Sequence, residues 1–464
     1  GFDDHVERKK AAMAAAAAAE HAREREEVEE RIKEAKEGAR VAHHSFLHSP
    51  PAPAHPAAPA PPEEAAGPDA DIYEEEVEVV ADEHGAVADG ETDNTVVLMV
   101  ALRACANDRK NKGKRCTLVL RQGKYLTGPI TLPSHTTLRI QELATLQCSP
   151  SPSQYETLDW AEQPSLPAYP PRQHGVHAPC IKAYNATDVR IEGGGKVDGA
   201  GIHWRQKELK FEPPVATVYF LGCSHVRMEG VTITDPPMVA VRVQYSDHVS
   251  VKEAFFVDDE RLEGHDALVV DSSSDVEVRS SHMAVGGAAV RIKSGDGLEG
   301  EARAIRTEHV LVTESTVKGG RGVVLDDSMA GGATNISITR INFEGAAISE
   351  EGSQWVPIGG KKGRARTDRG GRGATAEVVD GITVLMKRSG LSRASIVRGV
   401  RVTDIRGSHM GHVLVVSQHE GGDRKGEYPP ELHDLQVARV RVEGAVRAGG
   451  LLGLPRGAAR GAVG

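Results

Sequence analysis

Large aromatic side chains are scarce in this sequence. Only 18 of its 464 residues are Phe, Tyr or Trp, whereas glycine reaches 50. A core with so few large rings must be filled by aliphatic side chains packed in layers. The scarcity also argues against a nucleic-acid stacking surface, which needs exposed aromatic rings.

Long apolar runs are absent as well. No stretch approaches the roughly 20 apolar residues that a membrane span requires. The Ala-rich stretch from Ala11 to Ala19 lacks Leu, Ile and Phe and has charges on both sides. We interpret it as part of a polar helix, and we see no signal peptide in this chain.

The five cysteines show no Cys-x-x-Cys spacing, so neither a metal site nor any other cofactor is expected. We interpret them as buried free thiols and keep open a bridge between Cys105 and Cys116 across a short loop. The odd number leaves at least one thiol without a partner in the chain. Two triplets, Asn185-Ala-Thr187 and Asn335-Ile-Ser337, match the N-glycosylation acceptor and are compatible with secretion.

The formal net charge of −10 is distributed unevenly. Residues 63–93 carry thirteen carboxylates and no Lys or Arg, and residues 1–40 sum to −2. Removing these contributions from −10 leaves +5 for the chain from residue 94 onward. The acidity therefore belongs to a short segment, and the body is mildly basic.

Three segments follow from the composition. Residues 1–40 predict a charged, Ala-rich helix, and residues 41–82 predict a disordered linker that is first rich in Pro and Ala and then acidic. Residues 83–464 are the predicted folded domain. A helix is expected from Asn94, followed by a strand that opens at Cys116.

A short pattern recurs through the middle of the chain: a small or polar residue, then apolar, any, apolar. The spacings between successive copies are 37, 23, 27, 34 and 26 residues. The copies begin at Asp188, His225, His248, Asp275, His309 and Asn335. Short alternating strands without room for crossover helices favour an all-β fold, a right-handed parallel β-helix with one coil per repeat. A β-sandwich is the alternative, but its two-residue Asn-Gly and Asp-Gly turns are nearly absent.

Several segments resemble a known family. Gly85–Thr95 is similar to the opening of pectin-degrading β-helix proteins, and Gly123–Ser134 to their first strand pair. Ile191–Trp204 is similar to the segment before their catalytic coils, and Val290–Gly295 and Gly363–Thr367 complete the match. Together these motifs resemble the polygalacturonases, glycoside hydrolase family 28, within the pectin lyase-like superfamily. The resemblance covers roughly residues 80 to 445 and implies inverting hydrolysis of a polygalacturonate-like chain.

The resemblance also implies site residues. The family's Asn-Thr-Asp triplet falls on Gly264, His265 and Asp266, which leaves Asp266 as the candidate catalytic carboxylate or a contact to a sugar hydroxyl. The alternative is a solvated turn residue. The Asp-Asp pair that should follow falls on Gly287 and Ala288, so the acid pair is missing.

Arginines replace further residues of the family pattern. The Gly-His-Gly motif becomes Gly320-Arg321-Gly322, and Arg-Ile-Lys becomes Arg364-Ala365-Arg366. We expect Arg321, Arg364 and Arg366 to bind the substrate, because a guanidinium pairs bidentately with a carboxylate or a sulfate. If coils stack as expected, Arg321 lies two strand spacings from Asp266. A basic loop without a ligand is the alternative.

Other acidic and titratable residues near these positions have simpler interpretations. Asp258-Asp259 is interpreted as a surface loop, Asp271 as a turn residue that hydrogen-bonds its own backbone, and His265 as a structural or solvated side chain. Asp326-Asp327 is interpreted as a turn, with the alternative that it replaces the missing acid over Asp266.

Three functions remain open at this point. The first is a polygalacturonase-like glycosidase of weak or lost activity, involved in carbohydrate metabolism and cell wall organisation. The second is a non-catalytic module that binds an anionic polysaccharide, and the third is a uronate lyase. In each case the expected partner is a pectin-like anionic polysaccharide, without nucleic acid or a membrane span. By resemblance we expect a monomer located outside the cell or in the cell wall.

Overall fold

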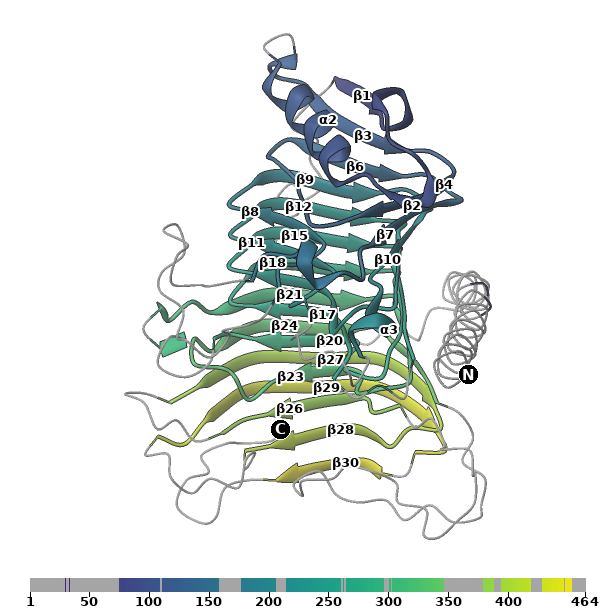
Figure 1. The fold of residues 1–464 in the computed structure, drawn as a ribbon. Coiled ribbons are helices and arrows are strands. Elements are labelled where there is room, and N and C mark those ends of the chain that lie inside the picture. The colour runs from purple at the N-terminus through teal and green to yellow at the C-terminus, as the bar shows by residue number, and fades with distance from the viewer. Residues whose placement is uncertain are drawn as a thin grey trace, which may run out of the picture.

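The protein is a right-handed parallel β-helix in which successive coils stack along one axis (Figure 1). The computed structural model describes residues 75–108, 111–157, 177–205, 214–259, 262, 264–295, 300–301, 303–345, 379–387, 394–418, 428–445 and 447–452, together with Glu30 and Lys33. Glu30 and Lys33 are exposed and helical. The rest of the predicted N-terminal helix, and most of the predicted linker, lie outside the described residues.

Each coil contributes strands to three parallel ladders. The first ladder consists of β1 (Glu76–Val80), β3 (Arg115–Leu120), β6 (Thr136–Ile140), β9 (Thr187–Glu192), β12 (Ser224–Glu229), β15 (Asp247–Lys252), β18 (Ser274–Arg279), β21 (Thr307–Thr313), β24 (Ala333–Thr339), β27 (Ile396–Ser408) and β29 (Glu431–Glu443). The second ladder consists of β2 (Asp89–Asp93), β4 (Gly123–Thr127), β7 (Ala144–Cys148), β10 (Lys196–Asp198), β13 (Thr232–Thr234), β16 (Phe255–Val257), β19 (His282–Ala284), β22 (Thr316–Lys318) and β25 (Asn342–Glu344). The long strand β27 pairs with both β24 and β25, which joins these two ladders into one sheet.

The third ladder forms a separate ten-stranded sheet, and it carries the candidate site. Its strands are β5 (Ile130–Thr131), β8 (Ile181–Tyr184), β11 (Val218–Leu221), β14 (Val239–Gln244), β17 (Asp266–Asp271), β20 (Val290–Lys293), β23 (Val323–Leu325), β26 (Ile382–Leu385), β28 (His412–Ser417) and β30 (Arg447–Leu452). Strand pairing within the ladders is parallel, which confirms the predicted β-helix and excludes the sandwich.

The repeat found in the sequence has a backbone cause. The first residue of every copy has a positive φ of 52° to 57°. Asn, Asp and His enter this left-handed region more readily than other residues with a side chain. The polar residue therefore bends each coil, and the apolar residues after it enter the first ladder.

The core is a set of stacked aliphatic side chains. Val226, Val249, Val276, Val310 and Ile336 lie in register on five successive coils, and each is at most 2% exposed. A side chain repeated at every strand spacing fills the narrow interior without large rings. This layered packing explains the shortage of aromatic residues.

A helix covers the N-terminal end of this core. Helix α2 (Thr95–Asn107) buries Leu98, Ala101 and Leu102, and the predicted helix at this position is thereby confirmed. Three further short elements are α3 (Gly201–Trp204) and the 3-10 turns η1 (Asp82–His84) and η3 (Pro152–Gln154).

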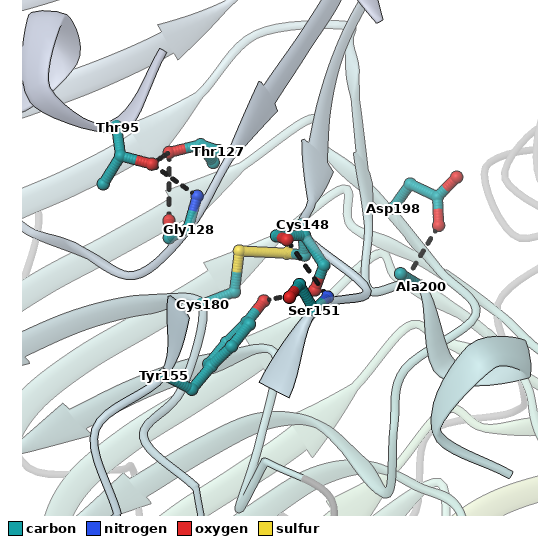
Figure 2. The surroundings of a disulfide bond; sticks show 10 residues. Thr95, Thr127, Gly128, Cys148, Ser151, Tyr155, Cys180, Asp198 and Ala200 are labelled. Atoms are coloured by element: carbon teal, nitrogen blue, oxygen red, sulfur yellow. Dashed lines mark hydrogen bonds between the residues drawn. A yellow bond between two sulfur atoms is a disulfide. The ribbon is translucent and has the colours of Figure 1, made fainter. Parts of the chain in front are cut away.

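Two disulfides hold the N-terminal coils together. Cys105 of α2 is bonded to Cys116 of β3, the bridge that the sequence left open. Cys148 at the end of β7 is bonded to Cys180 just before β8, as Figure 2 shows. The prediction of buried free thiols is wrong for these four residues, because stacked coils bring Cys148 and Cys180 together across 32 residues. Cys223 is buried and free, in agreement with the odd number of cysteines.

The acidic segment is partly built into the fold. Strand β1 lies inside the predicted linker 41–82 and pairs in parallel with β3, so the ordered domain begins before residue 83. The Arg139 guanidinium contacts the carboxylates of Glu76, Glu78 and Glu192. The linker prediction failed here because the strand's carboxylates are neutralised by a cation from another coil.

Candidate active site

Three successive strands of the third ladder begin at the positions singled out in the sequence. Asp266 opens β17, Gly287 and Ala288 precede β20, and Arg321 precedes β23. The Gly287 amide donates to the His265 carbonyl at 3.0 Å, and the Arg321 amide donates to the Gly287 carbonyl at 2.8 Å. These positions are therefore stacked on three coils, with Arg321 exposed and two coils away from Asp266.

Asp266 is buried in an ion pair. Its carboxylate is held by Arg291, whose Nε donates to Oδ2 at 2.5 Å and whose Nη2 donates to Oδ1 at 2.9 Å. The Ala288 amide donates to Oδ1 at 2.7 Å. Asp266 is only 5% exposed, so the interpretation as a solvated turn residue does not hold.

The positions at which the sequence resemblance expects an acid pair are filled. A Cβ at Gly287 would lie 2.5 Å from Oδ1 of Asp266 and 2.6 Å from the His265 backbone, closer than real Cβ contacts. Ala288 is fully buried and packs with Val324 and Leu385 in an apolar cluster apart from the main core. Neither position has room or solvent for a carboxylic acid.

A second carboxylate reaches the same arginine. Nη1 of Arg291 donates to Oδ2 of Asp326 at 2.6 Å, so one guanidinium lies between Asp266 and Asp326. The Ser328 amide donates to Oδ1 of Asp326 at 3.1 Å, as expected for the predicted turn. The turn therefore places its first carboxylate on the same guanidinium as Asp266.

The two carboxyl groups of this turn titrate differently. Burial, the hydrogen bond to Asp326 and its negative charge raise the pKa of Asp327 to about 6, although Lys387 lies 3.5 Å away. Burial also opposes ionisation of Asp326, but the charges of Lys293 and Arg291 hold the pKa of that group below its ordinary value. Asp326 is thus the carboxylate of the pair, and Asp327 stays protonated in acid until the pH rises to about 6.

Other predicted roles change in the structure. Nδ1 of His265 lies 2.9 Å from Oδ2 of Asp258, which is 3% exposed, so Asp258 is not on a surface loop. Asp271 closes β17 and accepts the Gly295 amide at 2.9 Å and the Ser272 hydroxyl at 3.0 Å. Asp271 therefore links two coils, and the interpretation as a self-contained turn residue is wrong.

A basic row runs across the third ladder. Lys182, Tyr219, Arg242, Val269 and Arg291 occupy equivalent positions on successive coils. Arg242 lies over the Tyr219 ring, 5.6 Å from its centroid. Tyr219 belongs to a cluster apart from the main core, which places this row on the outer face of the ladder.

The sequence reasoning gave no role to Arg291 or Lys293. Strand alternation could have found them, because Val290 and Ile292 are fully buried and their neighbours on the strand must point the other way. Arg364 and Arg366 lie outside the described residues, so their position relative to this row is still a prediction.

The described part of the chain contains neither a cluster of metal ligands nor a helix suited to span a membrane. Its His, Cys, Asp and Glu side chains form no group of three or more that could hold a metal ion. Among the helices of the described ranges, none combines the length and the apolar character of a membrane span.

Comparison with known proteins identifies relatives of this region. Residues 168–364 match the family model "Glycosyl hydrolases family 28". A probable polygalacturonase of Vitis vinifera is 27% identical over 273 residues, which cover 56% of this chain and 54% of the relative. A probable polygalacturonase of Arabidopsis thaliana is 24% identical over 176 residues, 36% of each protein. The matched part of the chain thus spans about half or less of the length of these relatives.

Solved structures with the same fold are more distant in sequence. A family 28 exopolygalacturonase of Yersinia enterocolitica superposes with a TM-score of 0.63 at 15% identity, covering 83% of this chain and 68% of that chain. The polygalacturonase of Erwinia carotovora ssp. carotovora gives a TM-score of 0.58 at 15% identity, covering 86% of this chain and 100% of that chain. At this identity the likeness establishes the fold.

Proposed function

Because the chain carries a glycosyl hydrolase family 28 domain, we propose that it is a polygalacturonase-like hydrolase of pectin-like anionic polysaccharide. The observation that carries this proposal is the stack of Asp266 and Arg321 at the family's positions, beside the basic row of the third ladder. The curated relatives of grape and Arabidopsis are described as probable polygalacturonases, which supports the substrate class.

The basic row has the regular repeat of a surface that could follow a polymer, and each of its cations also contacts a carboxylate of the protein. Strands of neighbouring coils lie about 4.8 Å apart, so equivalent side chains form a regular line along the helix axis. Lys182, Arg242 and Arg291 stand on this line, and Arg321 is exposed near its end. Binding to such a row weakens as salt screens the charges.

Hydrolysis is expected to be slow. The inverting reaction needs one protonated carboxyl group and one carboxylate roughly 6.5–9.5 Å apart, with a water between the carboxylate and the sugar. Gly287 and Ala288 cannot supply the acid, and a positioned general acid or base is typically worth about 10²–10⁴ in rate. Without another acid in their place, turnover is expected to be lower by about this factor than in a family member that retains both acids.

A second candidate function is binding without cleavage. It is favoured by Arg291, because its guanidinium occupies the space between Asp266 and Asp326 and engages both carboxylates. In this alternative the ion pair keeps the Asp266 carboxylate from accepting the proton of an attacking water. In this alternative the fold retains the polysaccharide surface and has lost the reaction.

One experiment separates these candidates from each other and from a lyase. The full chain is incubated with polygalacturonate and with a neutral glucan, and binding, reducing ends and unsaturated product are measured. Reducing ends without unsaturated product support hydrolysis, salt-sensitive binding without either supports the module, and unsaturated product supports elimination. Equal binding to the neutral glucan would contradict the proposed substrate class.

A matched pair of variants tests the binding surface. Arg321→Ala and Arg401→Ala remove the same charge, but Arg401 is an exposed residue of β27 in the first ladder. We expect Arg321→Ala to weaken polygalacturonate binding about two- to fivefold, in the range of a single exposed ion pair, and Arg401→Ala to leave it unchanged. Equal effects of the two variants would show that net charge, not this face, determines binding.

We also propose a location outside the cell or in the cell wall, with the protein acting as a monomer. The two disulfides support this location, because such bonds persist in oxidising compartments. Mass spectrometry of the protein from its native source tests it: loss of both disulfides there would contradict secretion.

A further inference from the structure

The turn after β23 presents a pair of acidic groups whose contacts connect them to the candidate catalytic carboxylate. Asp326 and Asp327 follow the last residue of β23 directly. Arg291 extends from β20 and contacts Asp266 through Nε and Nη2 and Asp326 through Nη1. Both carboxylates therefore lie within reach of one planar group on the same face of the third ladder.

The members of this pair differ in environment. The side chain of Asp326 is 13% exposed and lies 2.6 Å from the Arg291 guanidinium. The side chain of Asp327 is 27% exposed and lies 3.5 Å from the Lys387 ammonium. One member is thus held as a carboxylate, while burial and its neighbour raise the pKa of Asp327 to about 6. Two carboxyl groups with protonation states pushed apart by their surroundings are the arrangement that acid catalysis requires.

We propose that Asp327 is the general acid of this site and takes the place of the acids missing at Gly287 and Ala288. This inference rests on the proposed hydrolase function. Asp327 is more exposed than Asp326, so its proton is accessible to a bound sugar. Asp326 keeps the proton on Asp327 by accepting its hydrogen bond.

The reaction balances with water as the only co-reactant. Asp327 gives its proton to the glycosidic oxygen, and the bond from the anomeric carbon to that oxygen breaks with its electron pair remaining on the oxygen. Water adds to the anomeric carbon and gives its second proton to Asp266. Oδ2 of Asp266 accepts a hydrogen bond from Nε of Arg291, and its second lone pair is left for the water.

The charged groups around Asp327 come from three elements. Asp326 precedes it in the same turn, Lys387 follows β26, and Lys293 of β20 and Arg291 act through Asp326. One acidic group and three cations therefore determine its protonation. Deprotonation of Asp327 should end hydrolysis as the pH rises above about 6.

The test compares Asp327→Asn with Asp275→Asn, which removes a half-exposed carboxylate on the first ladder. Reducing-end release from polygalacturonate is measured between pH 4 and 8, together with binding. We expect Asp327→Asn to lower kcat about 10²-fold or more with little change in binding, and to abolish the loss of activity near pH 6. Asp275→Asn should behave as wild type, and Asp327→Glu should retain part of the rate.

The possible failures are distinguishable. If Asp327→Asn has a kcat within threefold of the wild type and the same pH profile, the role of Asp327 is overturned and the hydrolase function still holds. Binding of polygalacturonate without hydrolysis by the wild type overturns both. Thermal melting of each variant verifies folding, and if Asp327→Asn does not fold, the rate and pH profile of Asp327→Glu decide.

Discussion

Replacing Arg291 by methionine tests the most buried charges of the site. The change keeps a side chain of similar length and removes the only group that contacts both Asp266 and Asp326 through described ion pairs. Three charge-assisted hydrogen bonds are lost, at 2.5, 2.6 and 2.9 Å. Two carboxylates, 7% and 13% exposed, then face each other without this cation.

The expected cost follows from this geometry. Removing one partner of a buried ion pair leaves an uncompensated charge and typically costs about 3–5 kcal/mol of unfolding free energy. Asp266→Asn should cost less, about 1.5–3 kcal/mol, because Arg291 then still pairs with Asp326. The double variant should be more stable than the sum of the two losses predicts.

The pKa of Asp326 determines how the stability loss in Arg291→Met depends on pH. In the wild type the pKa of Asp326 lies below its unfolded value, so its stabilisation is present above about pH 4 and is lost as the pH falls through the folded pKa. Without Arg291 the pKa of Asp326 rises, because burial opposes ionisation and Lys293 is then the cation left to lower it. The variant therefore loses less stability than the wild type as the pH falls. Urea denaturation at pH 4 and pH 7 should show a smaller gap between the two proteins at pH 4. A cost below 1 kcal/mol at pH 7, or a gap that widens in acid, would refute the ion-pair account.

Three further outcomes are expected. Gly287→Asp, which restores one acid of the family pattern, should destabilise by about 1–3 kcal/mol or more and give no gain in hydrolysis, because its Cβ meets the Asp266 carboxylate; increased reducing-end release would contradict the geometry. Cys148→Ser with Cys180→Ser should cost about 3–4 kcal/mol in urea, as expected for a 32-residue separation, and an unchanged midpoint would disprove that role. Burial raises the pKa of Asp235 to about 6, so the folded state binds this proton more tightly than the unfolded state. As the pH rises from 4 to 6, the wild type should therefore lose about 2–3 kcal/mol of stability relative to Asp235→Asn. Parallel stability curves for the two proteins would rule this out.

The fold could be predicted because its signals are local. The residue that begins each repeat must adopt a positive φ, and the two apolar positions after it must enter a stacked core. Both demands fall on neighbouring residues, so the period of the coils is visible in the sequence. Strand β1 was missed because its glutamates belong to a long acidic run, although residues 76–79 alternate polar and apolar side chains as a strand does. The contact of Glu76 and Glu78 with Arg139 of another coil is not visible in that local pattern.

The candidate site was predicted only in part for the same reason. The stack of Asp266, Gly287 and Arg321 follows from the order of the coils. The contacts of Arg291 do not, because they join residues 25 and 35 positions apart through the far end of a long side chain. Asp258 and His265 are likewise joined across a turn whose course the sequence pattern does not determine.

The residues at the positions where the family resemblance expects acids form one connected arrangement with Asp266 and Arg291. Glycine at 287 leaves the space in which the Asp266 carboxylate lies, and the amide of Ala288 binds that carboxylate. Arg291 compensates its charge, and Ala288 closes the place of the second acid with an apolar cluster. Each of these residues therefore fits the others. A substitution at one of them alone is expected to lower stability, through a steric clash at position 287 or an unpaired charge at position 291. A general acid on this face must therefore be a carboxyl group outside that arrangement, and Asp327 meets this condition because its described ion pair is with Lys387, not with Arg291.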